Sequence, residues 1–268
     1  MNPFPHIVDV HAHVYPAKIA TKAVVAIGRF YDLPMAQPGT SKNLIASGSA
    51  IGVTRYLIHS AATTPEQVRA INDSIVRECR ARPDLFSGFG TLHPDMADPG
   101  TEVAYILSQG LLGVKLHPDF QRFAIDDPKA DPLYAACEGR LPILFHAGDR
   151  RYAFTNPARI AAVADRFPRL TIIAAHFGGY SEWEDARRFL HPRAMYFDTS
   201  SSLFAFEPQH AADMIRAAGV EKFLFGSDFP MWDHAGEFER FLRIPLADDE
   251  REAILWKNAV RLFPGLPC

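Results

Sequence analysis

The chain has 268 residues, of which 48% are hydrophobic and 22% are charged, and its formal net charge is -3. A chain of this length and composition is expected to fold around a large globular core, which argues against disorder. The small negative charge provides no basic surface for nucleic acid, and no apolar run approaches the length of a membrane span. The three cysteines lack the spacing of a zinc knuckle or a disulfide framework. We expect a cytoplasmic protein without nucleic-acid or membrane partners.

Short apolar runs recur along the chain, and helical spacing follows most of them. The predicted strands cover 6–13, 53–61, 86–94, 111–118, 142–149, 170–179, 194–201 and 222–230. The predicted helices cover 41–51, 64–83, 98–110, 131–140, 156–168, 181–192, 207–219 and 248–263. Several helices begin with Thr-Pro, Asp-Pro or Asn-Pro, which supply a capping side chain and then a proline at the first helical position. Continuous apolar strands that alternate with helices indicate a parallel sheet buried on both faces.

Eight such units favour the closed (β/α)8 barrel, or TIM barrel, within the α/β class over the open doubly wound sheet. No G-x-G-x-x-G follows the first predicted strand. We expect a single domain over residues 1–268. The segment 15–39 is longer than a typical strand-to-helix connection and contains proline and glycine, so it is expected to form a cap over the site or, alternatively, an oligomer contact.

The predicted strands end in polar residues. In a barrel the C-terminal ends of all strands converge on one face, where reactive side chains collect. The endings, in chain order, are His13, His59, His93, His117, His146, His176, Asp198 and Asp228. A single histidine of this kind is often satisfied by a backbone carbonyl, but eight polar endings together predict a functional site.

The stretch "DVHAH" places His11 and His13 on the same face of a strand, because alternate side chains point the same way. Two imidazoles in this arrangement suit a divalent metal, with His146 as a third ligand and Asp228 as a fourth. Zinc fits these ligands best, although manganese, cobalt and iron would also bind them. His176 would act as the proton-transferring base, and Asp228 would share that task while bound to the metal.

The residues "DVHAH", the single histidines of the fifth and sixth predicted strands, and "LFGSDFP" resemble the amidohydrolase superfamily, in its amidohydrolase-related branch. The chain is similar to the aminocarboxymuconate-semialdehyde decarboxylase relatives, and the resemblance runs from Asp9 to the closing "NAVRLF". It implies one metal with ligands His11, His13, His146 and Asp228, and a catalytic histidine at His176. Dimer formation is common among such relatives, so a homodimer is also implied.

Lys115 and His117 lie two residues apart on the fourth predicted strand, hence on one face. Binuclear members of the superfamily carry a carboxylated lysine on that strand, which would make Lys115 a bridge between two metals. We expect the mononuclear arrangement, with Lys115 holding a substrate carboxylate and His117 lining the pocket. In the loop after the fifth strand, Asp149 and Arg150 are further candidates for substrate binding, since arginine binds carboxylates through two parallel hydrogen bonds. The alternatives are an internal ion pair for Lys115 and a solvated loop for Arg150.

Three functions remain open from the sequence. The first is a hydrolase in which metal-activated water attacks an amide, lactone or related bond of a small carboxylated substrate. The second is a nonoxidative decarboxylase of an aromatic or unsaturated acid on the same site. The third is a metal-binding protein without turnover, which the additional base His176 argues against, because a structural zinc site is closed by its protein ligands.

Overall fold

The computed structural model describes residues 4–266, and these residues form two compact units. The first unit contains the chain up to His59, the segment Glu78–Ser87, and the chain from Thr199 onward. The second unit contains Ser60–Arg77 and Gly88–Asp198. The single-domain organisation predicted for 1–268 stays a prediction.

All eight predicted strands are present, and the sheet order follows the chain from the first strand to the eighth. The strands are β1 (Val8–His13), β2 (Arg55–His59), β3 (Phe86–Thr91), β4 (Gly113–Leu116), β5 (Ile143–Phe145), β6 (Ile172–Ala174), β7 (Tyr196–Asp198) and β8 (Phe223–Leu224). Their described pairings are parallel. The predicted TIM-barrel fold is therefore confirmed.

Helices lie between the strands, and each predicted helix is found, usually with shorter bounds. The α-helices are α1 (Ala17–Tyr31), α2 (Ser41–Ser49), α3 (Val68–Ala81), α4 (Pro99–Ser108), α5 (Pro118–Gln121), α6 (Asp131–Cys137), α7 (Pro157–Arg166), α8 (Trp183–Phe189), α9 (Pro208–Ala218), α10 (His234–Leu242), α11 (Asp248–Glu252) and α12 (Asn258–Leu262). A π-helical turn, Ala253–Lys257, joins the last two. Two of the expected caps are present, since Asp98 accepts a hydrogen bond from the Thr101 N–H and Asn156 from the Arg159 N–H. The prediction is wrong at two other starts, because Thr64 makes no capping hydrogen bond and Asp131 lies within α6, after its N-cap Ala130. Among the described residues, no helix is long and apolar enough to cross a membrane.

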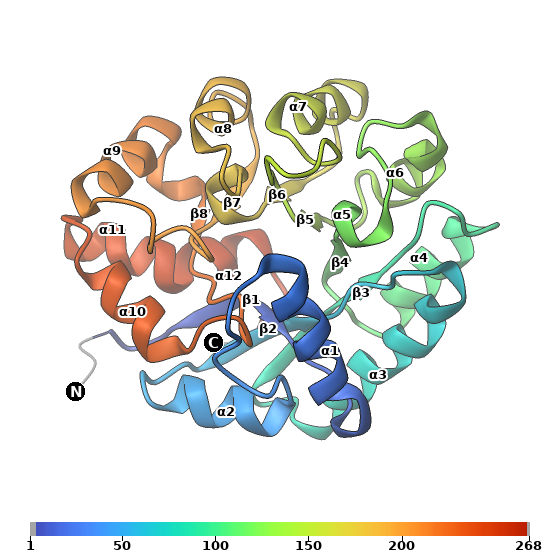
Figure 1. Ribbon diagram of the computed structural model, residues 1–268, viewed down its shortest axis with the longest axis horizontal. Helices are drawn as coiled ribbons and strands as arrows, with labels where there is room; N and C mark the ends of the chain where they lie inside the picture. The colour runs from blue at the N-terminus through green and yellow to red at the C-terminus, as the bar shows by residue number, and fades with distance from the viewer. Residues whose placement is uncertain (1–3, 267–268) are drawn as a thin grey trace. The chain divides into compact units, whose positions relative to one another are not determined.

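In the first unit, β1 is held on both sides. It pairs with β2 in parallel, with His13 opposite His59, and the Val10 N–H donates to the carbonyl of Phe225, just after β8. Helices α10 to α12 belong to the same unit as β1 and β2. Helix α10 packs beside α2 (Figure 1). The strand that carries the His-x-His motif is thus held on both sides, although its register with β2 shifts between Asp9 and Ala12.

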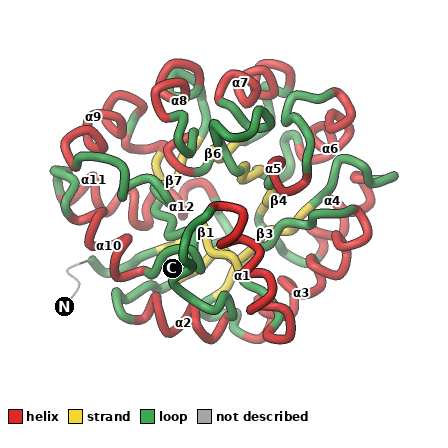
Figure 2. The backbone as a smooth tube through the Cα atoms, viewed as in Figure 1, coloured by secondary structure: helices red, strands yellow, loops and turns green. Residues whose placement is uncertain are grey.

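The second unit holds the parallel strands from β4 to β7 in unbroken register, with Lys115 opposite Leu144 and Phe145 opposite Ala174. Helices α4, α6, α7 and α8 lie along one side of the strands β4 to β6, as Figure 2 shows. Ile143, Leu144 and Phe145 are fully buried, as expected for a short strand in the middle of a parallel sheet.

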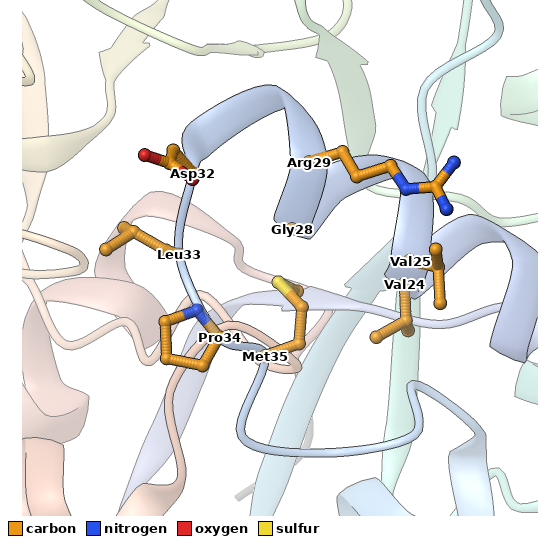
Figure 3. Close-up of a pocket in the computed structure, with 8 residues that line it drawn as sticks. All are labelled: Val24, Val25, Gly28, Arg29, Asp32, Leu33, Pro34 and Met35. Atoms are coloured by element: carbon orange, nitrogen blue, oxygen red, sulfur yellow. The ribbon is translucent and has the colours of Figure 1, made fainter.

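The segment 15–39, predicted as a cap or loop insertion, is mostly helix. Helix α1 ends at Asp32, which adopts left-handed backbone geometry (φ 53°), and the chain then returns along the helix. At Gly28 an added Cβ would lie 3.0 Å from the Leu33 carbonyl oxygen, so glycine permits this close return. The turn encloses a pocket of about 550 Å³ lined by α1 and residues 32–35 (Figure 3). The predicted site residues do not line it, and a capping role for 15–39 stays a prediction.

Candidate metal centre and neighbouring polar clusters

The two histidines of β1 lie next to each other inside the first unit. His11 is fully buried and His13 is 9% exposed. Their Nε2 atoms are 3.3 Å apart. The strand alternation that predicted a shared face is confirmed by this contact.

Asp228 completes a triangle with these histidines. Its Oδ1 atom is 3.3 Å from Nε2 of His11 and 3.3 Å from Nε2 of His13. Asp228 reaches this position in left-handed backbone geometry (φ 56°), fixed by its N–H bond to the His11 carbonyl oxygen (2.9 Å). Ligand atoms about 2.0–2.1 Å from a zinc ion, at the corners of a tetrahedron, lie about 3.3–3.4 Å apart. The three side chains therefore fit a divalent metal without rearrangement.

A buried network centred on Asp9 supports the triangle. Asp9 Oδ1 accepts from the backbone N–H of His11 and of Ser227, both at 3.0 Å. Asp9 Oδ2 accepts from the Ser227 hydroxyl at 2.6 Å and lies 2.9 Å from Nε2 of His234. Asp9 and His234 are fully buried. The carboxylate thereby joins β1, the segment after β8 and α10, and so fixes the backbone that carries the triangle.

Two more groups of the first unit surround the triangle. The ring centroid of His59 lies 4.4 Å from that of His13 and 5.0 Å from that of His11. His59 is therefore a further candidate metal ligand beside these two histidines. Burial, together with the negative charge of Asp228, raises the pKa of Tyr15 well above its usual value. Tyr15 consequently stays a hydrogen-bond donor at any working pH.

In the second unit, His146 and His176 face each other. Nδ1 of His146 is 3.0 Å from Nε2 of His176, and both residues are buried. His176 has left-handed backbone geometry (φ 61°); its N–H donates to Asp198 Oδ1 at 3.0 Å, and its carbonyl accepts from Nε1 of Trp183 at 3.0 Å. Asp198 and Trp183 thus hold the turn in the strained conformation that presents the imidazole.

His117 and Asp119 form a second cluster with His146, and all three are buried. His117 Nδ1 accepts from the Phe120 N–H (3.4 Å), as the cap of α5, and its ring stacks on that of His146 at 4.0 Å and 6°. Asp119 Oδ2 lies 3.4 Å from His146 Nε2 and accepts from the Thr155 hydroxyl, while Oδ1 has no hydrogen-bond partner among the described residues. Burial raises the pKa of Asp119 to about 7.

The other predicted substrate-binding residues are also in the second unit. Lys115 is fully buried on β4. Arg151 holds the Asp149 side chain, because its Nη2 donates to Asp149 Oδ2 at 2.6 Å. The backbone N–H of Asp149 donates to the Glu182 carboxylate. The Arg150 guanidinium donates to the carbonyl of Ser181 through Nε at 3.1 Å and also through Nη2. These contacts fix the loop after β5.

The structure therefore brings the predicted residues together in two sets. His11, His13 and Asp228 meet in the first unit, and His146, His176 and His117 meet in the second. Sequence reasoning missed three contributors in the first unit, namely Asp9, Ser200 and Ser201. Asp9 stands two residues before His11 in the His-x-His motif, a signal that the sequence carries. The two serines only follow the polar end of the seventh strand, and this position does not by itself indicate their contacts with His11 and Asp228.

An eight-stranded α/β barrel with a His-x-His strand and a neighbouring aspartate defines a class of metal-dependent enzymes. The amidohydrolase family model matches residues 8–265, and the chain belongs to this family. The family is metal-dependent, and the buried histidine and aspartate groups described above are its candidate ligands here. No curated protein matches the chain.

Solved structures show the same fold over the whole chain. An uncharacterized TIM-barrel protein from Bordetella bronchiseptica is 24% identical, with 96% of this chain and 98% of that chain covered and a TM-score of 0.76. A dihydroxybenzoic acid decarboxylase from a Polaromonas species, solved with bound manganese and an inhibitor, is 17% identical (98% and 97% covered, TM-score 0.75). A "probable 2-pyrone-4,6-dicarboxylic acid hydrolase" from Acinetobacter baumannii is 18% identical (98% and 100% covered, TM-score 0.70). These similarities establish the fold.

Proposed function

We propose that the protein is a metal-dependent hydrolase that opens an amide, lactone or related bond of a small carboxylated substrate. The observation that carries this proposal is the triangle of His11 Nε2, His13 Nε2 and Asp228 Oδ1, with all three sides at 3.3 Å. Three ligand atoms at tetrahedral spacing leave one corner open, as in catalytic rather than structural zinc sites.

One divalent ion, zinc in the first instance, would be held by His11, His13 and Asp228, and the family resemblance implies His146 as a further ligand. When bound, such an ion lowers the pKa of water to about 7 and so supplies hydroxide at neutral pH. Manganese is a reasonable second metal, since the Polaromonas decarboxylase was solved with it.

Two side chains are assigned to proton transfer. Asp228 has one oxygen in the triangle and the other bonded to the Ser201 hydroxyl, so any proton it takes from water is received at a carboxylate of fixed orientation. His176 Nε2, which lies 3.0 Å from Nδ1 of His146, is assigned to pass a proton to the leaving group. An imidazole suits this task because it can both accept and donate a proton.

The substrate is proposed to carry a carboxylate because the predicted substrate-binding residues are cationic or polar. Lys115 is fully buried on β4, and a lysine that is charged in a medium of low dielectric constant attracts an anionic partner strongly. Arg150 is assigned to the same task, and His117 and Asp149 are assigned to other contacts with the substrate. The homodimer implied by the resemblance and the cytoplasmic location remain predictions.

A second candidate is nonoxidative decarboxylation, which is favoured by the presence of a dihydroxybenzoic acid decarboxylase among the structures with this fold. In that reaction His176 Nε2 would first deliver a proton to the carbon that bears the carboxylate. The bond between that carbon and the carboxylate then breaks, carbon dioxide leaves, and the bonding electron pair restores the conjugated system. Only an aromatic or unsaturated acid can accept the electrons in this way.

The experiment that tests the function uses chelator-treated protein, reloaded with zinc or manganese, on two substrate panels. One panel contains carboxylated lactones and amides, and the other contains hydroxylated aromatic acids. Mass spectrometry distinguishes the gain of one water from the loss of carbon dioxide. We expect metal-dependent hydrolysis in the wild type and none in His11→Ala. Turnover that is equal without metal, or that survives in His11→Ala, would contradict the proposal, and loss of carbon dioxide alone would select the second candidate.

A further inference from the structure

The segment that follows β7 makes hydrogen bonds to two of the triangle's three side chains. The hydroxyl of Ser201 donates to Asp228 Oδ2 at 2.5 Å, and Ser200 Oγ lies 3.1 Å from His11 Nδ1. Each serine contacts the atom of the ligand that faces away from the triangle, since Asp228 Oδ1 and His11 Nε2 form its corners. Both serines are buried, so these bonds are sheltered from water.

Trp232 determines the direction of the hydrogen bonds through Ser201. The indole Nε1 of Trp232 lies 2.9 Å from Ser201 Oγ, and an indole N–H can only donate. An ionised carboxylate can only accept, so the single proton of the Ser201 hydroxyl must point to Asp228 Oδ2. Both hydrogen bonds in this series therefore have a fixed direction, from Trp232 to Ser201 and from Ser201 to Asp228. The series holds Oδ2 and leaves Oδ1 for the triangle.

The backbone at both ends of this bond is held in a disfavoured conformation. Ser201 has a φ of 46° and Asp228 a φ of 56°, in the left-handed region that residues other than glycine rarely adopt. Residues keep this backbone geometry where surrounding contacts hold it in place, and such residues are found most often at functional sites. A serine used only to fill space would not require this geometry.

We propose that Ser201, supported by Trp232, is a positioning residue for the metal centre: it sets the orientation of Asp228 so that Oδ1 faces His11 and His13. This inference rests on the proposed function, because it requires a divalent ion at the triangle. Partners that orient a metal ligand typically contribute 10- to 100-fold in metal affinity. Trp232, which lies two hydrogen bonds from the Asp228 carboxylate, also serves as an internal fluorescent reporter of metal binding.

The test measures zinc and manganese affinity of the full chain by competition with a chelator, for wild type, Ser201→Ala and Ser202→Ala. Ser202 is the matched control, since its hydroxyl donates to the backbone carbonyl of Ser200. We expect Ser201→Ala to bind metal about 10- to 100-fold more weakly and Ser202→Ala to stay within about twofold of wild type. The metal-free melting temperature of Ser201→Ala should fall, because a buried hydrogen bond is lost. The diagnostic readout is the rise in melting temperature on adding metal, which should shrink in Ser201→Ala alone.

A second variant keeps the inference testable if Ser201→Ala fails to fold. Trp232→Phe removes the indole donor and keeps an aromatic ring beside Phe204 and Arg240, and we expect it to weaken metal binding about threefold to tenfold.

The possible failures are distinguishable. Wild-type affinity in Ser201→Ala, or an equal loss in Ser201→Ala and Ser202→Ala, would overturn the positioning role and leave the proposed function intact. Wild-type protein that binds neither zinc nor manganese would overturn both.

Discussion

Each unit of the protein contains a buried cluster of two histidines and one aspartate, yet their geometries differ. In the first unit, three ligand atoms of His11, His13 and Asp228 are mutually 3.3 Å apart. In the second, the rings of His117 and His146 are stacked at 4.0 Å and 6°. A metal lies near the plane of each imidazole that binds it, along the nitrogen lone pair, and two stacked parallel rings do not share such a position.

The cause of this difference is local secondary structure. His11 and His13 are alternate residues of a strand, so their side chains share a face. His117 and Asp119 have the same sequence spacing but lie at the cap and first turn of α5, where His117 accepts a backbone hydrogen bond. Residue type and spacing therefore do not define a metal site unless the backbone conformation is also known.

The largest effect should come from removing a corner of the triangle. His11→Ala is expected to lower zinc affinity on the order of 10³-fold, about 4 kcal/mol, because it deletes a direct ligand. Chelator competition, with circular dichroism to confirm the fold, measures this directly. Unchanged affinity would mean that the triangle is not the metal site.

Loss of the buried hydrogen-bond network of Asp9 should have the next largest effect, on the stability of the fold. Asp9→Ala leaves His234 and the donors of Ser227 without their buried acceptor, which we expect to cost about 3 kcal/mol in the free energy of unfolding. Urea titration gives the value. Asp95→Ala, at an exposed carboxylate, is the control, and equal losses in the two variants would contradict a special role for the Asp9 network.

Substitution of the proposed base should distinguish proton transfer in one cluster from metal binding in the other. His176→Asn should lower kcat about 100-fold, since general acid–base catalysis contributes at least that much, while metal content stays at the wild-type level. Loss of the metal in this variant would show instead that His176 is a ligand.

The ion pair between Arg216 and Glu250 should have the smallest effect. Hydrogen bonds from Arg216 and from the Ala247 N–H lower the pKa of Glu250 to about 2. Since an unfolded glutamate titrates near about 4.3, this stabilisation is complete above that pH and is lost as the pH falls toward 2. Glu250→Gln should therefore reduce stability by less than about 1 kcal/mol at pH 7 and by nothing near pH 2. Urea titrations at both values check this, and a difference that grows toward low pH would refute the assignment.

The sequence was sufficient to predict the fold because each strand and most helix starts carry strong local signals. The Asp-Pro and Asn-Pro starts of α4 and α7 are confirmed as caps. Helix α1 was missed because the proline and glycine around it were interpreted as loop signals, although they only begin the helix and permit its close return. β8 is two residues long, since the chain beyond Leu224 turns into the left-handed geometry of Asp228.

The site was predicted in part. The alternation of β1 was sufficient to bring His11 and His13 together, but the orientation of an imidazole depends on partners distant in sequence. His93 shows that a polar strand end does not by itself indicate a site residue. Its ring nitrogen accepts a hydrogen bond from the nearby Asp95 N–H, and burial lowers the pKa of its imidazole. Ser201 shows the converse, since its contact with Asp228 spans 27 positions and depends on a backbone conformation that no sequence pattern specifies.

The most direct test is the zinc content of three proteins, wild type, His13→Ala and His117→Ala, dialysed together against the same free zinc. The two variants each remove one histidine from one cluster and leave the other cluster complete. We predict about one equivalent in the wild type and in His117→Ala, and almost none in His13→Ala. Zinc retained by His13→Ala and lost from His117→Ala would contradict the account.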